Sequence, residues 1–297
     1  MNVTQDTDSG DNRLKPFQTL TVIGLGLIGG SFAKAIRTAG LAQQIIGCDA
    51  DTNNLQQGMA LGVIDQAEMD IARAVYQADL VLVAVPVGAM RSVFTTMQGH
   101  VAPHTLVTDT GSTKGSVIAD FTAACPAHIS QFVPGHPIAG KETSGVAAAT
   151  NDLYQNRTVI LTPTADNTAT TIHRIQSIWQ ACGADVVQMT PDQHDRYLAM
   201  TSHLPHMLAF MLMHLLDGER PEDVQTCSAG GLRDTTRIAG SNPTMWRDIA
   251  LANQAALQHS LHAYQQQLDQ LITALDAADG DELFQLFSRA QQLRKSL

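Results

Sequence analysis

Residues 19–31 read T-L-T-V-I-G-L-G-L-I-G-G-S, and this stretch decides the fold. A short aliphatic run leads directly into the pattern Gly24-x-Gly26-x-x-Gly29, and small, helix-compatible residues follow, so the predicted order is strand, tight turn, helix. In a Rossmann-type unit the first glycine makes the turn, the second admits a pyrophosphate to the backbone, and the third lets the helix pack on the strand. The pyrophosphate then lies at the positive end of the helix. The predicted cofactor contacts of this loop are Gly24, Gly26, Leu27, Ile28 and Gly29.

A second short strand, residues 45–49, ends in Asp49, twenty residues beyond Gly29. A carboxylate at this point accepts hydrogen bonds from the adenosine ribose hydroxyls and repels a 2′-phosphate, which favours NAD over NADP. A local role also stays open, because Asp49 precedes the turn-forming residues Asp51 and Asn53.

The chain then alternates between apolar strands and helices up to about residue 190. The continuous apolar run at 78–86 is typical of a strand buried on both faces of a parallel sheet. Val85 and Pro86 end this run, where doubly wound sheets bind ligands, and we predict that both contact the cofactor. Further strands are expected at 105–109, 157–163 and 184–189.

From Pro191 onward only helical periodicity is present. We therefore expect a disordered tail at 1–15, a Rossmann-type, doubly wound α/β dinucleotide-binding domain at 16–190, and an all-helical substrate and dimerisation domain at 191–297. Pro205 is expected to kink a long helix that runs to residue 216. The helices contain more Leu, Ala and Met than one bundle buries, which favours a homodimer through the C-terminal helices.

Composition excludes several other classes of protein. The 18 basic and 28 acidic residues give a formal net charge of -10, which argues against nucleic acid or an anionic membrane as a partner. The apolar runs are shorter than the ~20 residues needed to cross a bilayer, and residues 1–12 lack a signal peptide's basic and apolar segments. We therefore expect a cytoplasmic protein without membrane contact. The 4 cysteines include no C-x-x-C pair, so we expect free, buried thiols and no metal site.

Four polar residues outside the glycine loop are candidates for chemistry. His136 lies in a segment of prolines and glycines, 132–145, which predicts a rigid, irregular loop and a preorganised side chain. Ser112 follows a strand and either hydrogen-bonds substrate or simply caps the next helix. In the helical half, Arg233 and Arg237 stand at i and i+4, an arrangement suited to a carboxylate clamp or to a solvated face.

Several motifs occur in a fixed order along most of the chain. They are the glycine loop at 22–31, T-D-T-G-S-T-K at 108–114, G-H-P-I-A-G-K-E-T-S-G at 135–145, H-D at 194–195, S-H-L-P-H at 202–206 and G-L-R-D-T-T-R-I-A at 231–239. Together they resemble the prephenate/arogenate (cyclohexadienyl) dehydrogenase family of tyrosine biosynthesis, over about residues 17–252. Many members have Gly-Ser-Glu where this chain has Gly140-Lys141-Glu142, which adds a basic side chain near the predicted site.

The resemblance implies NAD-dependent oxidative decarboxylation of prephenate, or of arogenate, between which no residue chooses. It implies that His136 takes the proton of the substrate hydroxyl while hydride leaves, and that Ser112 orients the same hydroxyl. The implied substrate contacts are His206, Arg237, Asp234, Glu142, Lys141 and Trp246. Alternative roles stay open for two of them: packing for Trp246 and support of Arg237 for Asp234. The resemblance also places the active site in the cleft between the two domains.

Two other functions remain to be weighed. The β-hydroxyacid dehydrogenases share the two-domain plan, but they use a catalytic lysine in the helical half, and residues 191–294 contain no lysine. A Rossmann protein that senses nucleotides without turnover is the second, and NADH formation would distinguish it from an enzyme.

Overall fold

The computed structural model describes residues 15–140 and 143–296. The chain divides into two compact units between Asp195 and Arg196. Of the expected tail, only Lys15 falls within the described residues. The expected domain limits at 15 and 190 stay predictions.

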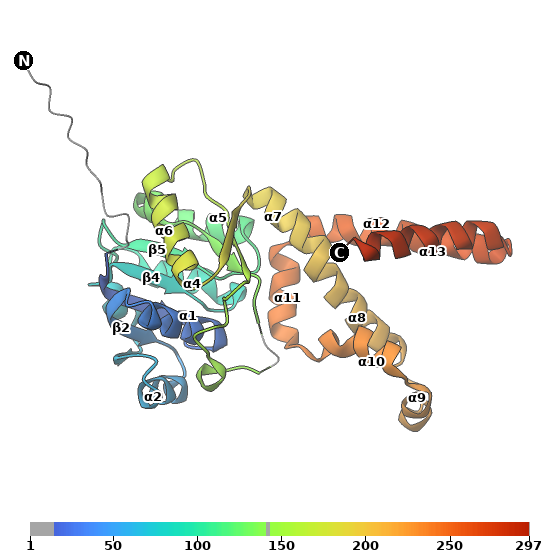
Figure 1. Cartoon of the computed structure of the whole chain (residues 1–297), viewed down its shortest axis with the longest axis horizontal. Helices are drawn as coiled ribbons and strands as arrows, with labels where there is room; N and C mark the ends of the chain where they lie inside the picture. The colour runs from blue at the N-terminus through green and yellow to red at the C-terminus, as the bar shows by residue number, and fades with distance from the viewer. Residues whose placement is uncertain (1–14, 141–142, 297) are drawn as a thin grey trace, which may run out of the picture. The chain divides into compact units, whose positions relative to one another are not determined.

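The first unit is built on a parallel sheet of five strands in the order β3-β2-β1-β4-β5. Figure 1 labels three of them, β2, β4 and β5. The strands are β1 (Phe17–Ile23), β2 (Ala42–Cys48), β3 (Gln66–Glu68), β4 (Leu80–Val83) and β5 (Leu106–Asp109). In the register, Val22 of β1 pairs with Gly47 of β2 on one side and with Leu82 of β4 on the other. The strand order reverses between β1 and β4, which is where doubly wound sheets bind ligands.

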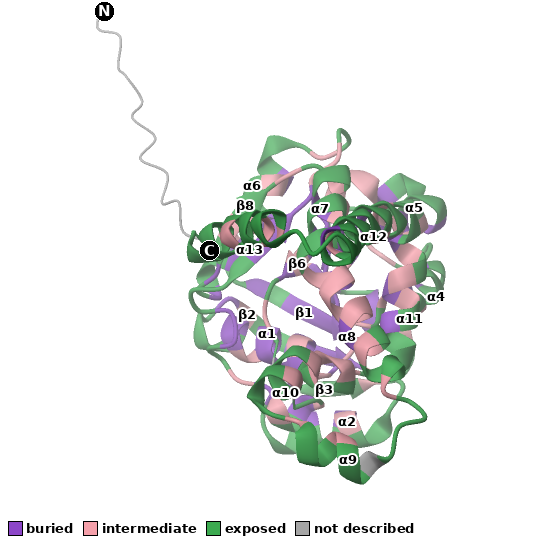
Figure 2. Cartoon of the chain, turned by 90° about the vertical axis from the view of Figure 1, so that its right-hand side faces the viewer, coloured by how far each residue is buried: buried purple, intermediate pink, exposed green. Residues whose placement is uncertain are grey.

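Helices pack on both faces of this sheet, so its central strands are buried (Figure 2). The helices of this unit are α1 (Leu27–Thr38), α2 (Thr52–Ala60), α3 (Ile71–Val75), α4 (Val87–Met97), α5 (Gly115–Ala124) and α6 (Ala169–Ala181). Helix α7 (Pro191–Leu198) crosses the boundary between the two units. One core cluster contains Phe32, whose ring meets Trp179 edge-on at 4.8 Å. The other contains Phe121 stacked on Phe132 at 4.0 Å. The expected doubly wound class is confirmed.

A second, smaller sheet holds the His136 segment. Its strands are β6 (Gly135–Pro137), β7 (Thr158–Leu161) and β8 (Asp185–Gln188), in that order, with β6 antiparallel and β8 parallel to β7. The prediction of an irregular loop around His136 is therefore wrong, because this residue pairs with Ile160. The strand tolerates Pro137 because β6 is at the edge of its sheet, where a missing N–H costs no ladder hydrogen bond.

The second unit consists of helices within its described residues. They are α8 (Leu204–Leu215), α9 (Pro221–Cys227), α10 (Gly230–Thr236), the 3₁₀ turn η4 (Arg237–Gly240), α11 (Pro243–Ala252), α12 (Gln254–Asp276) and α13 (Gly280–Lys295). Between α7 and α8 lies a π-helical turn, Ala199–His203. The expected disturbance at Pro205 thus takes the form of a wider turn just before it, since proline has no N–H to donate to the preceding turn.

Two expectations for this unit are wrong. The helical periodicity of the sequence predicts a single helix at 244–274, but the helix is interrupted at Asn253. The backbone of Asn253 leaves the helical region (φ -116°, ψ 36°), and its side-chain amide lies 3.2 Å from Nδ1 of His203. Of the cysteines, Cys227 is exposed and the other three are buried, because the short helix α9 has little packed against it.

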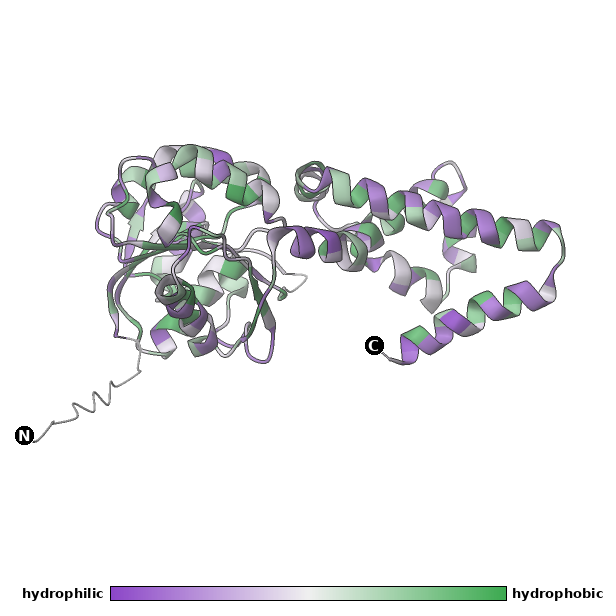
Figure 3. Ribbon diagram, turned by 90° about the horizontal axis from the view of Figure 1, so that it is seen from above, coloured by the Kyte–Doolittle hydropathy of each residue, from purple (hydrophilic) through white to green (hydrophobic). Residues whose placement is uncertain are grey.

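Large apolar side chains remain exposed along the last two helices. They include Leu268, Ile272 and Leu275 on α12, and Phe284 and Phe287 on α13. Figure 3 shows that hydrophobic and hydrophilic residues alternate along the helix that leads to the C-terminus. Within the part of the chain that the structure describes, no helix combines the length and the apolar character needed to cross a membrane.

Candidate active site

A cavity of about 410 Å³ opens at the carboxyl ends of β1, β2 and β4. This is the switch point of the sheet, where a doubly wound fold binds its ligand. The predicted cofactor residues that line it are Gly24, Gly26, Asp49, Val85 and Pro86. The side chain of Leu27 is buried in the core instead, and Ile28 packs against that core. The predicted roles of these two residues would therefore have to use their backbone groups.

The glycine loop has the shape that a dinucleotide requires. Gly24 has φ +94°, and a Cβ there would lie 2.5 Å from the carbonyl oxygen of Ala84. A Cβ on Gly29 would lie 2.1 Å from the carbonyl oxygen of Gly24, so the first turn of α1 is pressed against the loop. A Cβ on Gly26 meets nothing within 4 Å, which leaves open space beside the N-terminus of α1. Open space at a helix N-terminus, with the turn closed on either side, fits a pyrophosphate.

Asp49 has the local role that the sequence left open, and it also lies at the wall of the cavity, so its predicted contact with the ribose stays a prediction. Its Oδ1 accepts a hydrogen bond from the amide of Asp51 (2.8 Å), which is the local turn. Its Oδ2 accepts one from the amide of Leu25 in the glycine loop (2.7 Å), and the residue also lines the cavity. The carboxylate therefore holds the loop in place at the wall of the nucleotide cavity.

His136 belongs to a chain of three hydrogen-bonded side chains. Its Nδ1 lies 2.8 Å from Nε2 of His194, and Nδ1 of His194 lies 2.7 Å from Oδ1 of Asp195. Asp195 also accepts the backbone amides of Lys114 (2.7 Å) and Gly115 (2.8 Å) at the start of α5. Burial raises the pKa of Asp195, but these hydrogen bonds outweigh burial and hold that pKa below its usual value.

His194 is completely buried. Burial lowers the pKa of His194, and the positive charge of Lys114 lowers it further, although the hydrogen bond to Asp195 opposes both effects. A histidine with a lowered pKa is neutral near pH 7. In this form one ring nitrogen donates a hydrogen bond and the other accepts one, so the ring can orient a neighbouring group or pass on a proton.

A buried ion pair fixes the backbone on the other side of His136. The ammonium of Lys114 lies 2.5 Å from Oδ2 of Asp109 and donates to the carbonyl of Gly135 at 2.6 Å. Asp109 also accepts the amides of Gly111 (2.7 Å) and Gly135 (3.1 Å). Burial lowers the pKa of Lys114, and the Asp109 carboxylate opposes this shift. The end of β5 is thereby tied directly to the strand that carries His136.

From the sequence alone, no role is predicted for these residues around His136. Lys114, His194 and Asp195 all lie in the quoted motifs T-D-T-G-S-T-K and H-D. The sequence shows that each of them is an ionisable residue within a motif. It does not show that the side chain is buried or which residue it contacts.

Ser112 lies half-buried in the loop after β5. The helix that follows begins at Gly115 with Lys114 as its N-cap residue and no side-chain cap, so Ser112 does not cap it. Its hydroxyl makes no hydrogen bond within the described residues. The alternative of a purely capping role is therefore removed.

The candidate substrate residues of the second unit form their own group. The ring of His206 stacks on Trp246 with centroids 3.6 Å apart, and its Nδ1 donates to the carbonyl of Ser202 (2.9 Å). Trp246 is buried, so it packs beneath His206. Burial lowers the pKa of His206, and the nearby Arg237 lowers it further. Asp234 and Arg237 are exposed, whereas Lys141 and Glu142 lie outside the described residues.

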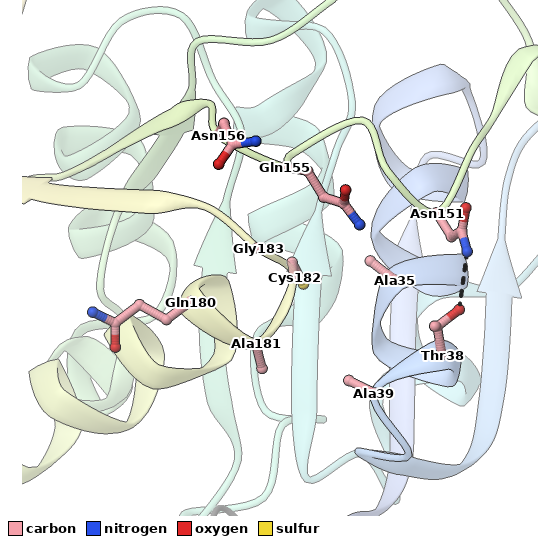
Figure 4. A pocket seen from close by; sticks show the side chains of 10 residues that line it. All are labelled: Ala35, Thr38, Ala39, Asn151, Gln155, Asn156, Gln180, Ala181, Cys182 and Gly183. Atoms are coloured by element: carbon pink, nitrogen blue, oxygen red, sulfur yellow. Dashed lines mark hydrogen bonds between the residues drawn. The ribbon is translucent and has the colours of Figure 1, made fainter.

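A separate hollow of about 350 Å³ lies beside the C-terminal ends of α1 and α6 (Figure 4). Its walls are small residues and amides such as Asn151 and Gln155. Cys182 is the one ionisable group among its lining residues, and burial raises the pKa of this thiol. The hollow therefore offers neither a base nor a charge for catalysis.

These features define a dehydrogenase with a Rossmann-type nucleotide-binding unit followed by a helical unit. Residues 32–188 match the family described as prephenate dehydrogenase, nucleotide-binding domain, and residues 190–289 match prephenate dehydrogenase, dimerization domain. The chain belongs to the prephenate dehydrogenase family, as the motifs predicted.

Individual relatives align with almost the whole of this chain. The cyclohexadienyl dehydrogenase of Zymomonas mobilis is 38% identical over 95% of this chain and 96% of its own length. Among solved structures, the prephenate dehydrogenase of Aquifex aeolicus in complex with hydroxyphenyl propionate and NAD+ is 33% identical, with a TM-score of 0.88, covering 94% of this chain and 98% of its own. The arogenate dehydrogenase of Synechocystis is 30% identical, with a TM-score of 0.80, covering 94% of this chain and 99% of its own.

Proposed function

We propose that this protein catalyses the NAD-dependent oxidative decarboxylation of prephenate to 4-hydroxyphenylpyruvate in tyrosine biosynthesis, with arogenate as the alternative substrate. The observation that carries the proposal is His136, held by a buried His–Asp pair in the same unit as the nucleotide cavity. The names of the relatives, which include prephenate, arogenate and cyclohexadienyl dehydrogenases, support the same substrate class.

The reaction needs one base and one hydride acceptor. A bound NAD would supply the hydride acceptor for the ring carbon that bears the hydroxyl. His136 takes the hydroxyl proton, and Ser112 orients that hydroxyl. The resulting ring ketone draws the electrons of the opposite carboxylate as carbon dioxide leaves, and the proton held by His136 returns to the phenolate. Aromatisation drives this second stage, so no further base is required.

Substrate recognition is proposed for the second unit. Arg237 binds a substrate carboxylate, since a guanidinium offers two parallel donors to it. His206 contacts the substrate, Trp246 supports the ring of His206 from below, and Asp234 stands one helical turn before Arg237 to orient it. Lys141 and Glu142 complete the proposed set.

Cofactor preference and assembly are also proposals. Asp49 favours NAD over NADP, because its carboxylate at the cavity wall would repel a 2′-phosphate. A homodimer through the C-terminal helices is supported by the exposed apolar residues of α12 and α13 and by the dimerization-domain match.

The test is to follow NADH formation with prephenate and arogenate, each with NAD and NADP, in the wild type and in His136→Asn. The variant should bind NAD as the wild type does and lose about 10²–10⁴-fold in turnover, which is the usual contribution of a general base. Turnover equal to the wild type would remove His136 from the mechanism. Binding of NAD without NADH formation from either substrate would instead indicate a nucleotide-sensing protein.

A further inference from the structure

His194 and Asp195 form a buried pair behind His136, and the donor and the acceptor of each hydrogen bond in this chain can be assigned. We propose that His194 and Asp195 are positioning residues that hold His136 in the tautomer whose Nε2 is unprotonated and faces the reaction as the base. This inference rests on the proposed role of His136, and it specifies which ring nitrogen acts as the base and which residues fix that tautomer.

The direction starts at Asp195. Its carboxylate already accepts the amides of Lys114 and Gly115, and the lowered pKa keeps it ionised at neutral pH, so it has only acceptor positions to offer. Nδ1 of His194, 2.7 Å from Oδ1, must therefore carry a proton and donate it to Asp195.

The next step depends on the charge of His194. The charged or titratable groups that act on it are Asp195 on its own helix, Lys114 and Asp109 from the β5–α5 segment, and His136 from β6. Complete burial and the Lys114 charge disfavour a second proton, so His194 is neutral at pH 7. With its proton on Nδ1, Nε2 of His194 is an acceptor.

The final step fixes His136. Its Nδ1, 2.8 Å from the acceptor Nε2 of His194, must donate a proton. A neutral imidazole carries one N–H, so Nε2 of His136 has none and can take up the substrate proton. When it does, the imidazolium keeps its bond to His194, and the Asp195 carboxylate stabilises the new charge through the intervening ring. No proton has to leave the chain of three.

The surroundings keep this chain rigid. Asp195 is anchored by two amides at the first turn of α5, and the amide of His194 bonds the carbonyl of Thr190 at 2.9 Å. On the other side, Lys114 holds the carbonyl of Gly135, the residue before His136. The imidazole of His136 is thus fixed through its ring nitrogen and through its backbone.

The kinetic test compares two substitutions at one position. In His194→Gln the side-chain oxygen can still accept the Nδ1 proton of His136, whereas His194→Phe keeps a ring in the space and removes the acceptor. We expect the Phe variant to lose about 10–100-fold in kcat with an unchanged KM for NAD, which is less than the ~10⁴-fold loss of a locked wrong tautomer. The Gln variant should recover most of that loss. Equal losses in both variants, or no loss in either, would overturn the proposal.

The second readout is independent of turnover. Imidazole ¹⁵N resonances distinguish protonated from unprotonated ring nitrogens, and those of His136 are identified by their absence in His136→Asn. The wild type should show a protonated Nδ1 and an unprotonated Nε2, and His194→Phe should show a mixture. A protonated Nε2 in the wild type would refute the tautomer even if the enzyme is active. A failure of the proposed function would appear elsewhere, as no NADH formation in the wild type, and a failure of the proposed role of His136 as full activity in His136→Asn.

Discussion

Two glycines of the loop at the start of α1 face different surroundings, which gives a matched pair of substitutions. An added Cβ on Gly26 meets no atom within 4 Å, whereas one on Gly29 lies 2.1 Å from the Gly24 carbonyl oxygen and 2.9 Å from Cγ1 of Val22. Gly26→Ala should therefore leave the fold intact and obstruct the nucleotide, and Gly29→Ala should damage the fold itself.

The magnitudes follow from these contacts. At Gly29 the clash involves backbone, so the loop or the helix must move, and overpacking of this kind costs about 1–3 kcal/mol. Alanine's better helix propensity returns at most about 1 kcal/mol. Because a Cβ 2.1 Å from a backbone oxygen places the cost in the upper part of that range, the net loss is about 1–2 kcal/mol, which corresponds to a fall in Tm of about 2–8 °C for a unit of this size. At Gly26 the methyl group separates a phosphate from the amides at the N-terminus of α1. Loss of one charged hydrogen bond there, worth about 1.5–3 kcal/mol, raises the Kd for NAD about 10–100-fold.

The assay is thermal unfolding without ligand, followed by calorimetric titration with NAD. Gly280→Ala is the control, because it adds a methyl group in open space on α13; it should leave NAD affinity unchanged and should not lower the Tm, since only the small gain in helix propensity remains. NAD affinity equal to the wild type in Gly26→Ala would refute the placement of the pyrophosphate. An unchanged Tm in Gly29→Ala would refute the close packing of loop and helix.

Three further predictions concern recognition, pH and thiol reactivity. Arg237→Ala should raise the KM for prephenate more than it lowers kcat, since a carboxylate clamp acts in the ground state as well; an unchanged KM in steady-state kinetics would point to Arg233 or Lys141. Folding lowers the pKa of His194, so below about pH 6.5 the folded protein binds fewer protons than the unfolded chain does. The free energy of unfolding that is present above this pH is therefore lost as the pH falls. Thermal unfolding should show Tm falling with acidification, less steeply in His194→Gln, and equal slopes would contradict this account. Burial raises the pKa of Cys48 to about 12, so at pH 7 iodoacetamide should modify the exposed Cys227 first, and mass spectrometry finding Cys48 labelled first would contradict its burial.

The sequence predicted best the elements whose burial is complete. Strand β4 and the glycine loop are unambiguous because a strand covered on both faces must be apolar throughout and a tight turn must use glycine. Strand β3, with the sequence Gln-Ala-Glu, carries no such pattern, because it lies at the sheet edge and its side chains are not enclosed. The same reasoning explains β6, where Gly135 and Pro137 indicate a loop although the backbone pairs with β7.

The site was predicted less completely than the fold, for a different reason. A glycine fingerprint is local, so its function is visible within ten residues. The partner of His136 is 58 residues away, and the interaction is a single hydrogen bond between two rings. Neither hydrophobic period nor local propensity encodes such a pair. Lys114 is similar: nothing in its neighbours indicates that a lysine there is fully buried.

The buried charges of the first unit act as one network of hydrogen bonds around His136. A buried ion pair gains little stability over apolar residues of the same size, because desolvation offsets the attraction unless every polar atom is matched. Asp109 is matched by two amides and an ammonium, and Lys114 by a carboxylate and a carbonyl. These partners lie at the ends of β5 and β6, and Asp195 joins the start of α5 to His194 in the same way. Each bond therefore fixes one strand or helix end relative to His136. We infer that these buried charges position the imidazole of His136 rather than add to the stability of the fold.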